Sequence, residues 1–313
     1  MTTFNRADPD RDRLSFPFAS GTAHTSLPAD DFETEDDLPY FSYAAPEDGK
    51  LKRLLIRAIE HATGQPRLKS MYLHHRENPR DGETFWQACI RYLDLTINVN
   101  DAGLAGFPRS GPVVVVANHP FGVLDGIVLS YLVCAVRPDF KILTNSVLYR
   151  APELRPYLLP IDFAETREAT RTNLDSRAEA RALLQRGGVV VVFPGGTVST
   201  ARRPFGNAED PDWKPFTARL IMGAKADVVP VYFAGQNGVW FQLASQMSQT
   251  LRVSLLFKEV ADRIGTTITA QMGAPIPFAD LQHLTDRQSL MAHLRQLTYG
   301  LKGQARPAKG RKR

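Results

Sequence analysis

A chain of 313 residues is long enough to bury one large hydrophobic core or two modest ones. Hydrophobic residues make up 43% of the chain and charged residues 23%, which is the balance of a globular protein. The net charge is +5, and no apolar run approaches the roughly 20 residues that span a bilayer, so the composition excludes a transmembrane helix.

The cysteine content and the first residues indicate the compartment. Cys89 and Cys134 both lie in apolar segments, where we expect buried thiols in a reducing compartment rather than a disulfide or a zinc site. Residues 1–12 are polar and contain no apolar stretch of the kind found in secretory signals. We therefore expect a cytoplasmic protein.

The two ends of the chain carry opposite charge. Residues 1–48 hold eleven acids and three bases, and we predict that residues 1–47 form a disordered acidic leader. Residues 302–313 hold six bases and no acid, which predicts a basic tail. Such a tail either binds an anionic membrane surface or is an ordinary solvated end. It has no interleaved aromatic residues, so we expect no binding to nucleic acid.

Three helices are predicted before the first strand, within residues 48–94. In residues 50–62 leucine, isoleucine and alanine recur at helical spacing beside Lys50, Arg53 and Arg57. This basic amphipathic helix either lies in a membrane interface or packs on its own domain. Two more helices are expected, near residues 67–77 and around Phe85 to Leu93. No linker divides residues 48–301, so we predict one domain there with this helical segment at its start.

From residue 95 onward the pattern alternates between strands and helices. Continuous apolar runs at 113–117, 189–193 and 228–233 predict strands buried on both faces. Further strands are expected at 95–99, 140–143, 251–257 and 266–272, and helices at 127–136, 166–185, 215–226 and 289–301. This alternation predicts an α/β fold with a mostly parallel central sheet covered by helices.

A histidine and an aspartate lie between two of these apolar elements. His119 and Asp125 fall between the strand at 113–117 and the helix at 127–136, so both are predicted in a short loop. A histidine takes a proton from a hydroxyl, and a carboxylate fixes its tautomer. Asp125 alternatively serves as an ordinary helix N-cap.

Two further stretches follow. The strand at 189–193 opens into Pro194-Gly195-Gly196-Thr197, where glycines expose backbone N–H groups to an anion or simply make a tight turn. In Val229-Pro230-Val231 a proline interrupts an apolar strand, which fits an edge strand or a strand end.

In this order and spacing the three stretches resemble the lysophospholipid (1-acylglycerol-3-phosphate) acyltransferase family. Its signature is Asn-His followed by an aspartate, then Phe-Pro-x-Gly-Thr, then Val-Pro-Val, and the match covers roughly residues 90–275. The segment 143–150 lies where the family has an acceptor-binding block that ends in arginine. The resemblance implies a glycerolipid-acyltransferase-like fold, with His119 and Asp125 as catalytic residues. The residues that it implies contact substrate are Asn118, Asn145, Arg150, Pro194, Gly195, Gly196 and Thr197.

Two departures from the family pattern are visible. Five residues separate His119 from Asp125 instead of four, and Gly122 is placed to absorb the insertion. The usual Phe-Pro-Glu-Gly-Thr-Arg has lost its acid and its base, as in a bacterial branch labelled hemolysin-like, to which lyso-ornithine-lipid acyltransferases are related. Arg150, Arg202 and Arg203 are candidate contacts for a phosphate or carboxylate, although for the last two an ordinary surface arginine is the favoured interpretation.

The resemblance implies direct transfer of a fatty acyl group from an acyl carrier protein or CoA thioester to a lysolipid hydroxyl. The acceptor would be lysophosphatidate or a lyso-aminolipid such as lyso-ornithine lipid, and the enzyme would work on the inner face of the cell membrane. No metal or other cofactor is expected. Two alternatives remain: a non-catalytic lipid-binding protein that keeps the fold, and thioester hydrolysis.

Overall fold

The apolar runs of the sequence form one sheet. The computed structural model describes residues 2–3, 49–145, 148, 152–162, 166–203, 205–247, 252 and 254–304. Within them eight strands pair in the order β1-β2-β10-β9-β3-β6-β4-β5, and all neighbours are parallel except β1 with β2 and β9 with β10. The bounds are Thr2–Thr3 (β1), Thr96–Val99 (β2), Val113–Ala117 (β3), Phe140–Asn145 (β4), Leu158–Ile161 (β5), Val189–Val192 (β6), Asp227–Ala234 (β9) and Thr267–Met272 (β10). The predicted mostly parallel α/β sheet is confirmed.

The two valine strands form the centre of the sheet. In β3 the side chains of Val113, Val115 and Ala117 face one hydrophobic cluster, and those of Val114 and Val116 face another. The valines of β6 alternate between the same two clusters. Burial on both faces explains why these strands read as continuous apolar runs rather than as an alternation.

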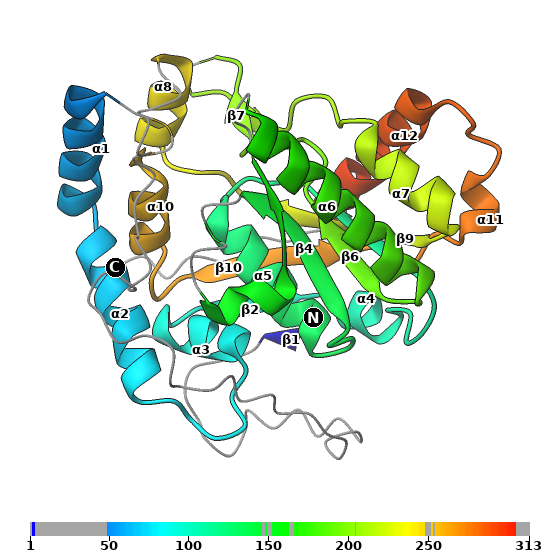
Figure 1. Ribbon diagram of the computed structural model, residues 1–313, viewed down its shortest axis with the longest axis horizontal. Helices are drawn as coiled ribbons and strands as arrows, with labels where there is room; N and C mark the ends of the chain where they lie inside the picture. The colour runs from blue at the N-terminus through cyan, green and yellow to red at the C-terminus, as the bar shows by residue number, and fades with distance from the viewer. Residues whose placement is uncertain are drawn as a thin grey trace.

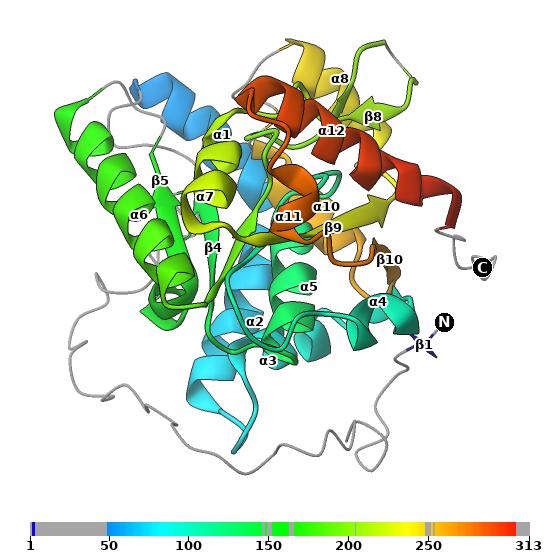
Figure 2. The same cartoon turned by 90° about the vertical axis from the view of Figure 1, so that its right-hand side faces the viewer.

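Helices cover both faces of the sheet (Figures 1 and 2). One cluster includes side chains of α2, α3, α5 and α10, and the opposite cluster includes side chains of α6, α7, α11 and α12. The α-helices are Lys50–Ala62 (α1), Gln65–Glu77 (α2), Phe85–Tyr92 (α3), Asp101–Ala105 (α4), Val123–Cys134 (α5), Arg167–Gln185 (α6), Phe216–Ala224 (α7), Val239–Met247 (α8), Leu256–Asp262 (α10), Phe278–Leu281 (α11) and Arg287–Gly300 (α12). Shorter elements are two 3-10 helices, Pro152–Tyr157 (η3) and Leu301–Gln304 (η4), and a two-stranded sheet of Thr200–Ala201 (β7) with Ala208–Glu209 (β8).

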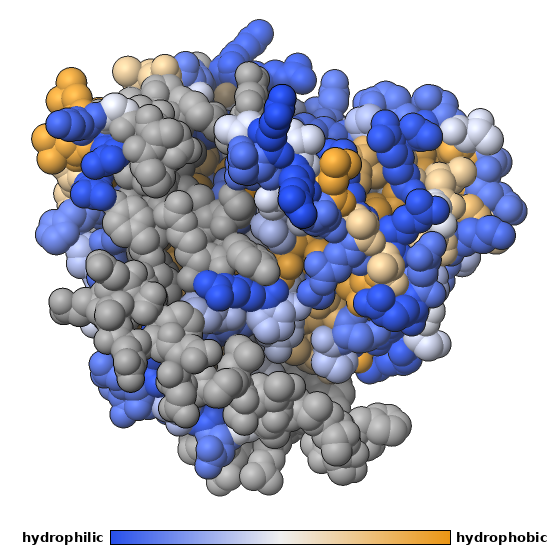
Figure 3. All heavy atoms as spheres, in the orientation of Figure 1, coloured by the Kyte–Doolittle hydropathy of each residue, from blue (hydrophilic) through white to orange (hydrophobic). Residues whose placement is uncertain are grey.

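Helix α1 turns its leucines outward. Ile56 and Glu60 are its buried residues, whereas Leu51 and Leu54 are 81% and 66% exposed. The apolar residues of α1 form an orange patch at the upper left of Figure 3. The helix is where the sequence predicts it, and its apolar stripe is not packed on the described part of the domain. None of the described helices combines the length and the apolar character needed to cross a bilayer.

The sequence predictions for residues 251–257 and for the start of α5 are wrong. The segment 251–257 was expected as a strand, but Arg252 and Ser254 are helical and α10 begins at Leu256. Leu256 and Val260 lie one helical turn apart and are both buried, so tertiary packing overrides the strand-like alternation. Helix α5 begins at Val123 rather than at residue 127, so Asp125 lies in its first turn and not in a loop.

The proline of the Val-Pro-Val stretch lies inside an interior strand, contrary to the expected edge or strand end. Pro230 pairs with Val116 of β3 on one side of β9. On the other side the β10 pairing ends at Met272, and the next residue, Gly273, donates its N–H to the Pro230 carbonyl (2.8 Å). The missing proline N–H therefore falls where the partner strand has already ended.

The predicted leader and tail lie mostly outside the described residues. Of residues 1–47 only Thr2–Thr3 are described, as strand β1 paired with β2, and of the tail only residues 302–304, in η4.

The start of β3 and the start of β6 are tied together by one buried arginine, Arg137. Its guanidinium makes two hydrogen bonds to the carboxylate of Asp139 (2.7 and 2.6 Å). It also donates to the carbonyl oxygens of Pro108, Gly111 and Gly187 (3.3, 3.4 and 2.5 Å).

We expect Arg137→Met to lower the free energy of unfolding by about 3 kcal/mol, because it removes a buried donor that bonds to Asp139 and to three carbonyl groups. Urea denaturation measures the change. Arg186→Met, which removes an exposed arginine nearby, should stay within about 0.5 kcal/mol of the parent. A loss of similar size in both variants would contradict this account.

Candidate active site

The loop between β3 and α5 is shaped by one buried carboxylate. Oδ2 of Asp125 accepts the backbone N–H groups of Phe121 (2.8 Å) and Gly122 (3.0 Å), so this residue caps α5 from its first turn rather than from the N-cap position. Gly122 occupies that N-cap position with φ 70° and ψ −117°, a conformation that L side chains rarely adopt. This is the glycine that the sequence indicates as the position able to take up the extra residue between His119 and Asp125.

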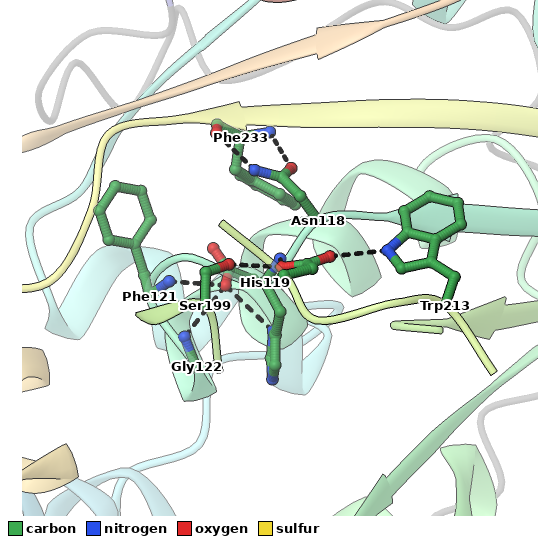
Figure 4. Close-up of polar contacts among 9 residues, drawn as sticks. Asn118, His119, Phe121, Gly122, Ser199, Trp213 and Phe233 are labelled. Atoms are coloured by element: carbon green, nitrogen blue, oxygen red, sulfur yellow. Dashed lines mark hydrogen bonds and ion pairs between the residues drawn. The ribbon is translucent and has the colours of Figure 1, made fainter. Parts of the chain in front are cut away.

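The same carboxylate oxygen faces the imidazole of His119. Nδ1 of His119 lies 3.1 Å from Oδ2 of Asp125, whose side chain is fully buried, whereas the histidine side chain is 19% exposed. Figure 4 shows the His119 ring and the amide groups of Phe121 and Gly122 converging on that carboxylate. The imidazole also stacks on the ring of Phe193, with centroids 4.0 Å apart. These contacts leave Nε2 as the nitrogen free to act on a substrate.

The surroundings of Asp125 determine its charge. Burial raises the pKa of its carboxyl group above the ordinary value, while His119 and the two backbone N–H groups oppose that rise. A carboxylate held in this way fixes the imidazole tautomer and stabilises an imidazolium ion. The pair can therefore accept a proton from a hydroxyl group at Nε2.

The loop after β6 lies beside this pair. The N–H of Gly196 donates to the carbonyl of Phe193 (3.0 Å), and Gly196 has φ 70°, which makes the tight turn expected from the sequence. Pro194, Gly196 and Thr197 line the adjoining cavity. Gly195 does not: it is buried, and a β-carbon there would lie 3.1 Å from Cβ of Asp210.

Asp210, which the sequence analysis missed, joins the two loops. Its Oδ1 accepts the backbone N–H of His119 (3.1 Å) and the hydroxyl of Ser199 (2.5 Å), and its Oδ2 accepts the indole N–H of Trp213 (2.9 Å). The N–H of Ser199 donates to the His119 carbonyl (2.8 Å). No motif marks this aspartate, which lies in a polar stretch and becomes buried only through tertiary contacts.

Asn118 holds the loop from the other side. Its side-chain amide donates to the carbonyl of Phe233 (3.0 Å) and accepts the Phe233 N–H (2.7 Å), as Figure 4 shows. The residue is buried and is not part of the cavity wall. Its side chain is therefore engaged in positioning the loop, not in the substrate contact that the resemblance implied.

A cavity of about 770 Å³ opens beside His119. Apolar side chains from α2, α3, α5 and η3 form one part of its wall, among them Met71, Trp86, Ile127 and Leu154. Polar side chains of Asn145, Asp162, Asn173 and Thr197 line another part. The cavity therefore suits a molecule with a long apolar chain and a polar group.

The cations of the cavity wall are not those that the sequence indicated. Arg202 and Arg203 are exposed and do not line the cavity, and Arg150 lies outside the described residues. Arg177, Lys214 and Arg252 line it instead. None of these belongs to a motif, and only the fold brings them to the site. Among the described residues, no three histidine, cysteine, aspartate or glutamate side chains are grouped to hold a metal ion.

Comparison with known proteins places the chain among acyl-transferring enzymes. A family model described as acyltransferase matches residues 49–306. The lyso-glycine lipid O-acyltransferase of Phocaeicola vulgatus is 27% identical over 235 residues, which cover 73% of this chain and 80% of that protein. The protein of the same name from Bacteroides thetaiotaomicron is 28% identical over 228 residues, which cover 70% and 80%. The crystal structure of the 1-acyl-sn-glycerophosphate acyltransferase of Thermotoga maritima aligns with a TM-score of 0.46 and 15% identity, covering 83% of this chain and 84% of that one.

We expect Asp210→Ala to lower the free energy of unfolding by about 3 kcal/mol, because the N–H of His119, the Ser199 hydroxyl and the Trp213 indole each lose their acceptor. Urea denaturation measures this loss. Asp212→Ala, which removes an exposed carboxylate two residues away, is the matched control and should change stability by less than about 0.5 kcal/mol. Equal stability of the two variants would refute the linking role of Asp210.

Proposed function

The chain belongs to the acyltransferase family, and we propose that it transfers a fatty acyl group from a thioester to the hydroxyl of a lysolipid in membrane lipid biosynthesis. Membership of the family makes it an enzyme that transfers acyl groups. The observation that carries the proposal is His119 at the wall of a largely apolar cavity, with the buried carboxylate of Asp125 behind it.

The reaction that we propose needs no acyl-enzyme intermediate. Nε2 of His119 accepts the proton of the acceptor hydroxyl as its oxygen attacks the thioester carbonyl carbon. Asp125 stabilises the imidazolium that forms. When the carbon–sulfur bond of the tetrahedral intermediate breaks, the imidazolium returns the proton to the leaving thiolate, and ester and thiol are released. The turn from Pro194 to Thr197 adjoins the reacting groups and, in this proposal, lines the acceptor site.

The comparison and the cavity support our choice of acceptor. The two relatives named as lyso-glycine lipid O-acyltransferases support a lyso-aminolipid acceptor, and lysophosphatidate is the second acceptor in the proposal. Asn145 lines the cavity and is placed to contact the head group, and Arg150 is proposed for the same task. The donor in the proposal is the thioester of acyl carrier protein or of CoA, and no cofactor takes part.

His119→Ala should abolish acyl transfer, with a loss of at least about a thousandfold, because the base that removes the hydroxyl proton is gone. Incubation with labelled acyl donor and lysolipid measures the product. The melting temperature should stay unchanged, since the imidazole is partly exposed. His283→Ala removes an exposed histidine and should keep full activity.

Three other outcomes would contradict the proposal. Retained transfer in His119→Ala would exclude its role as base. Free fatty acid released without an acceptor would identify a thioester hydrolase. Lipid binding without turnover in the parent protein would identify a non-catalytic lipid-binding protein.

We also propose that α1 docks the enzyme on the inner face of the cell membrane. Its exposed Leu51, Leu54 and Leu55 are flanked by Lys50, Arg53 and Arg57, a composition typical of helices that lie in an anionic interface. The basic tail at residues 302–313 would add electrostatic attraction of about 1 kcal/mol per basic residue near the surface.

Replacing both Leu51 and Leu54 by aspartate should weaken binding to anionic vesicles by at least about tenfold, because each buried leucine contributes about 1.5–3 kcal/mol. Vesicle sedimentation measures the binding. Leu174→Asp on α6 replaces a leucine that is also exposed and serves as the control. High salt should weaken binding in every form that keeps the tail. If a protein without residues 302–313 and with both aspartates still sedimented normally, neither segment would be the anchor.

A further inference from the structure

Lys214 lies on the tight turn beside the catalytic pair. A β-carbon built on Gly196 would lie 2.9 Å from Nζ of Lys214, 3.2 Å from its Cε and 3.5 Å from its Cδ. The end of the lysine side chain therefore runs across the face of Gly196, in space that only a glycine leaves open. Both residues line the cavity that also contains His119.

The backbone of Lys214 is held by the same network that holds His119. The N–H of Lys214 donates to the carbonyl of Pro194 (3.0 Å). Trp213, the preceding residue, is buried and donates its indole N–H to Asp210, which also accepts the N–H of His119. Lys214 and His119 thus line one cavity from backbone segments that are both held by a buried carboxylate.

The turn from Pro194 to Thr197 connects the imidazole of His119 with the ammonium of Lys214. The imidazole of His119 stacks on Phe193, and the carbonyl of Phe193 accepts the N–H of Gly196, over which the ammonium lies. An acceptor with its hydroxyl at Nε2 of His119 would therefore extend along the same turn toward Lys214. A lysolipid fits this arrangement, because its reactive hydroxyl and its head group belong to one covalent unit.

The charges of the cavity wall favour an anion. Among the described residues that line it, Asp162 is the only carboxylate, while Lys214, Arg177 and Arg252 are cations. Arg177 and Lys214 are both exposed, and the guanidinium of Arg177 lies 5.0 Å from the centre of the Phe216 ring. Lys214 is the cation in contact with the Pro-Gly-Gly-Thr turn.

We propose that the ammonium of Lys214 binds an anionic oxygen of the acceptor's head group while the acceptor hydroxyl lies on His119. The inference rests on the proposed function and adds a specificity-determining residue to it. The anionic oxygen belongs either to the carboxylate of an amino-acid lipid or to the phosphate of a glycerolipid. Lysine is suited to both, because its ammonium is a compact charge with three donors.

The test compares acceptors that differ only in head-group charge. A lyso-aminolipid with a free carboxylate is assayed beside its methyl ester, and lysophosphatidate beside the corresponding neutral monoacylglycerol. For the parent protein we expect a lower KM for the anionic member of the pair that it accepts. The pair that shows the difference identifies carboxylate or phosphate as the anion.

Lys214→Met should raise the KM for the anionic acceptor roughly tenfold, as expected from losing one hydrogen bond to a charged group, with kcat and the KM of the neutral acceptor little changed. Lys214→Arg should restore most of the preference. Arg219→Met, which removes an exposed cation from neighbouring α7 outside the cavity, should behave like the parent. The melting temperatures of all variants show whether each is folded, and Lys214→Gln replaces the methionine variant if that one is not.

Two results would overturn the assignment. Unchanged KM values in Lys214→Met would show that the ammonium does not contact the acceptor. A lowered kcat with every acceptor and unchanged KM would place Lys214 at the reacting carbonyl group instead of at the head group. If the parent transferred no acyl group to any acceptor, the proposed function would fail by itself. Equilibrium binding of the same lysolipids to the parent and to Lys214→Met would then still decide whether Lys214 binds the anion.

Discussion

The candidate site depends on the capture of one buried carboxylate by the beginning of a helix. Oδ2 of Asp125 is approached by the N–H groups of Phe121 and Gly122 and by Nδ1 of His119, and the side chain has no contact with solvent. An isolated charge buried in this way would be strongly unfavourable, and donors at a helix N-terminus are among the groups that compensate it. The interaction that begins α5 is thus the same interaction that orients the imidazole. A substitution at Asp125 removes a helix cap and the proposed partner of His119 together.

A second carboxylate repeats this arrangement one loop away. Asp210 accepts donors from His119, Ser199 and Trp213, and its own N–H donates to the hydroxyl of Tyr299 on α12 (2.8 Å). The loop after β3 and the loop after β6 are therefore held at the same edge of the sheet. Groups fixed in this way need little reorganisation when charge develops during a reaction. The rigidity of the site comes from backbone N–H groups bound to carboxylates, rather than from the residues of the family signature alone.

The sequence predicts those parts of the structure whose cause is local. The valine runs of β3 and β6 predict strands buried on both faces. His119, Asp125 and the Pro-Gly-Gly-Thr turn are recognisable because they follow these strands. Asp210 and Lys214 are not recognisable, because neither lies beside a predicted strand end and both act through contacts with residues distant in the sequence. Residues 251–257 are a similar case. Their apolar residues fit the spacing of a strand as well as that of a helix, and the helix is favoured only because α10 packs on α2 and α5. Pro230 is not at the edge or strand end that the sequence predicts. An interior proline is tolerated because the pairing of β10 with β9 ends at Met272, and the sequence of β9 alone does not show where its neighbour ends.

The arrangement of the N-terminal helices links the proposed membrane surface to the proposed chemistry. Helices α1 and α2 follow one another along the left side of Figure 1. Leu68, Met71 and Tyr72 of α2 form part of the cavity wall. The exposed leucines of α1 and part of the apolar cavity wall therefore lie on two successive helices. A lysolipid moving from a bilayer into the site would keep its chain in apolar surroundings if it travelled along this helix pair, which avoids the cost of about 0.8 kcal/mol for each methylene exposed to water. In a protein that works away from membranes, the outward-facing stripe of α1 would add little to folding stability and would favour aggregation. In an enzyme that takes its acceptor from a bilayer, the same stripe holds the cavity at the source of its substrate.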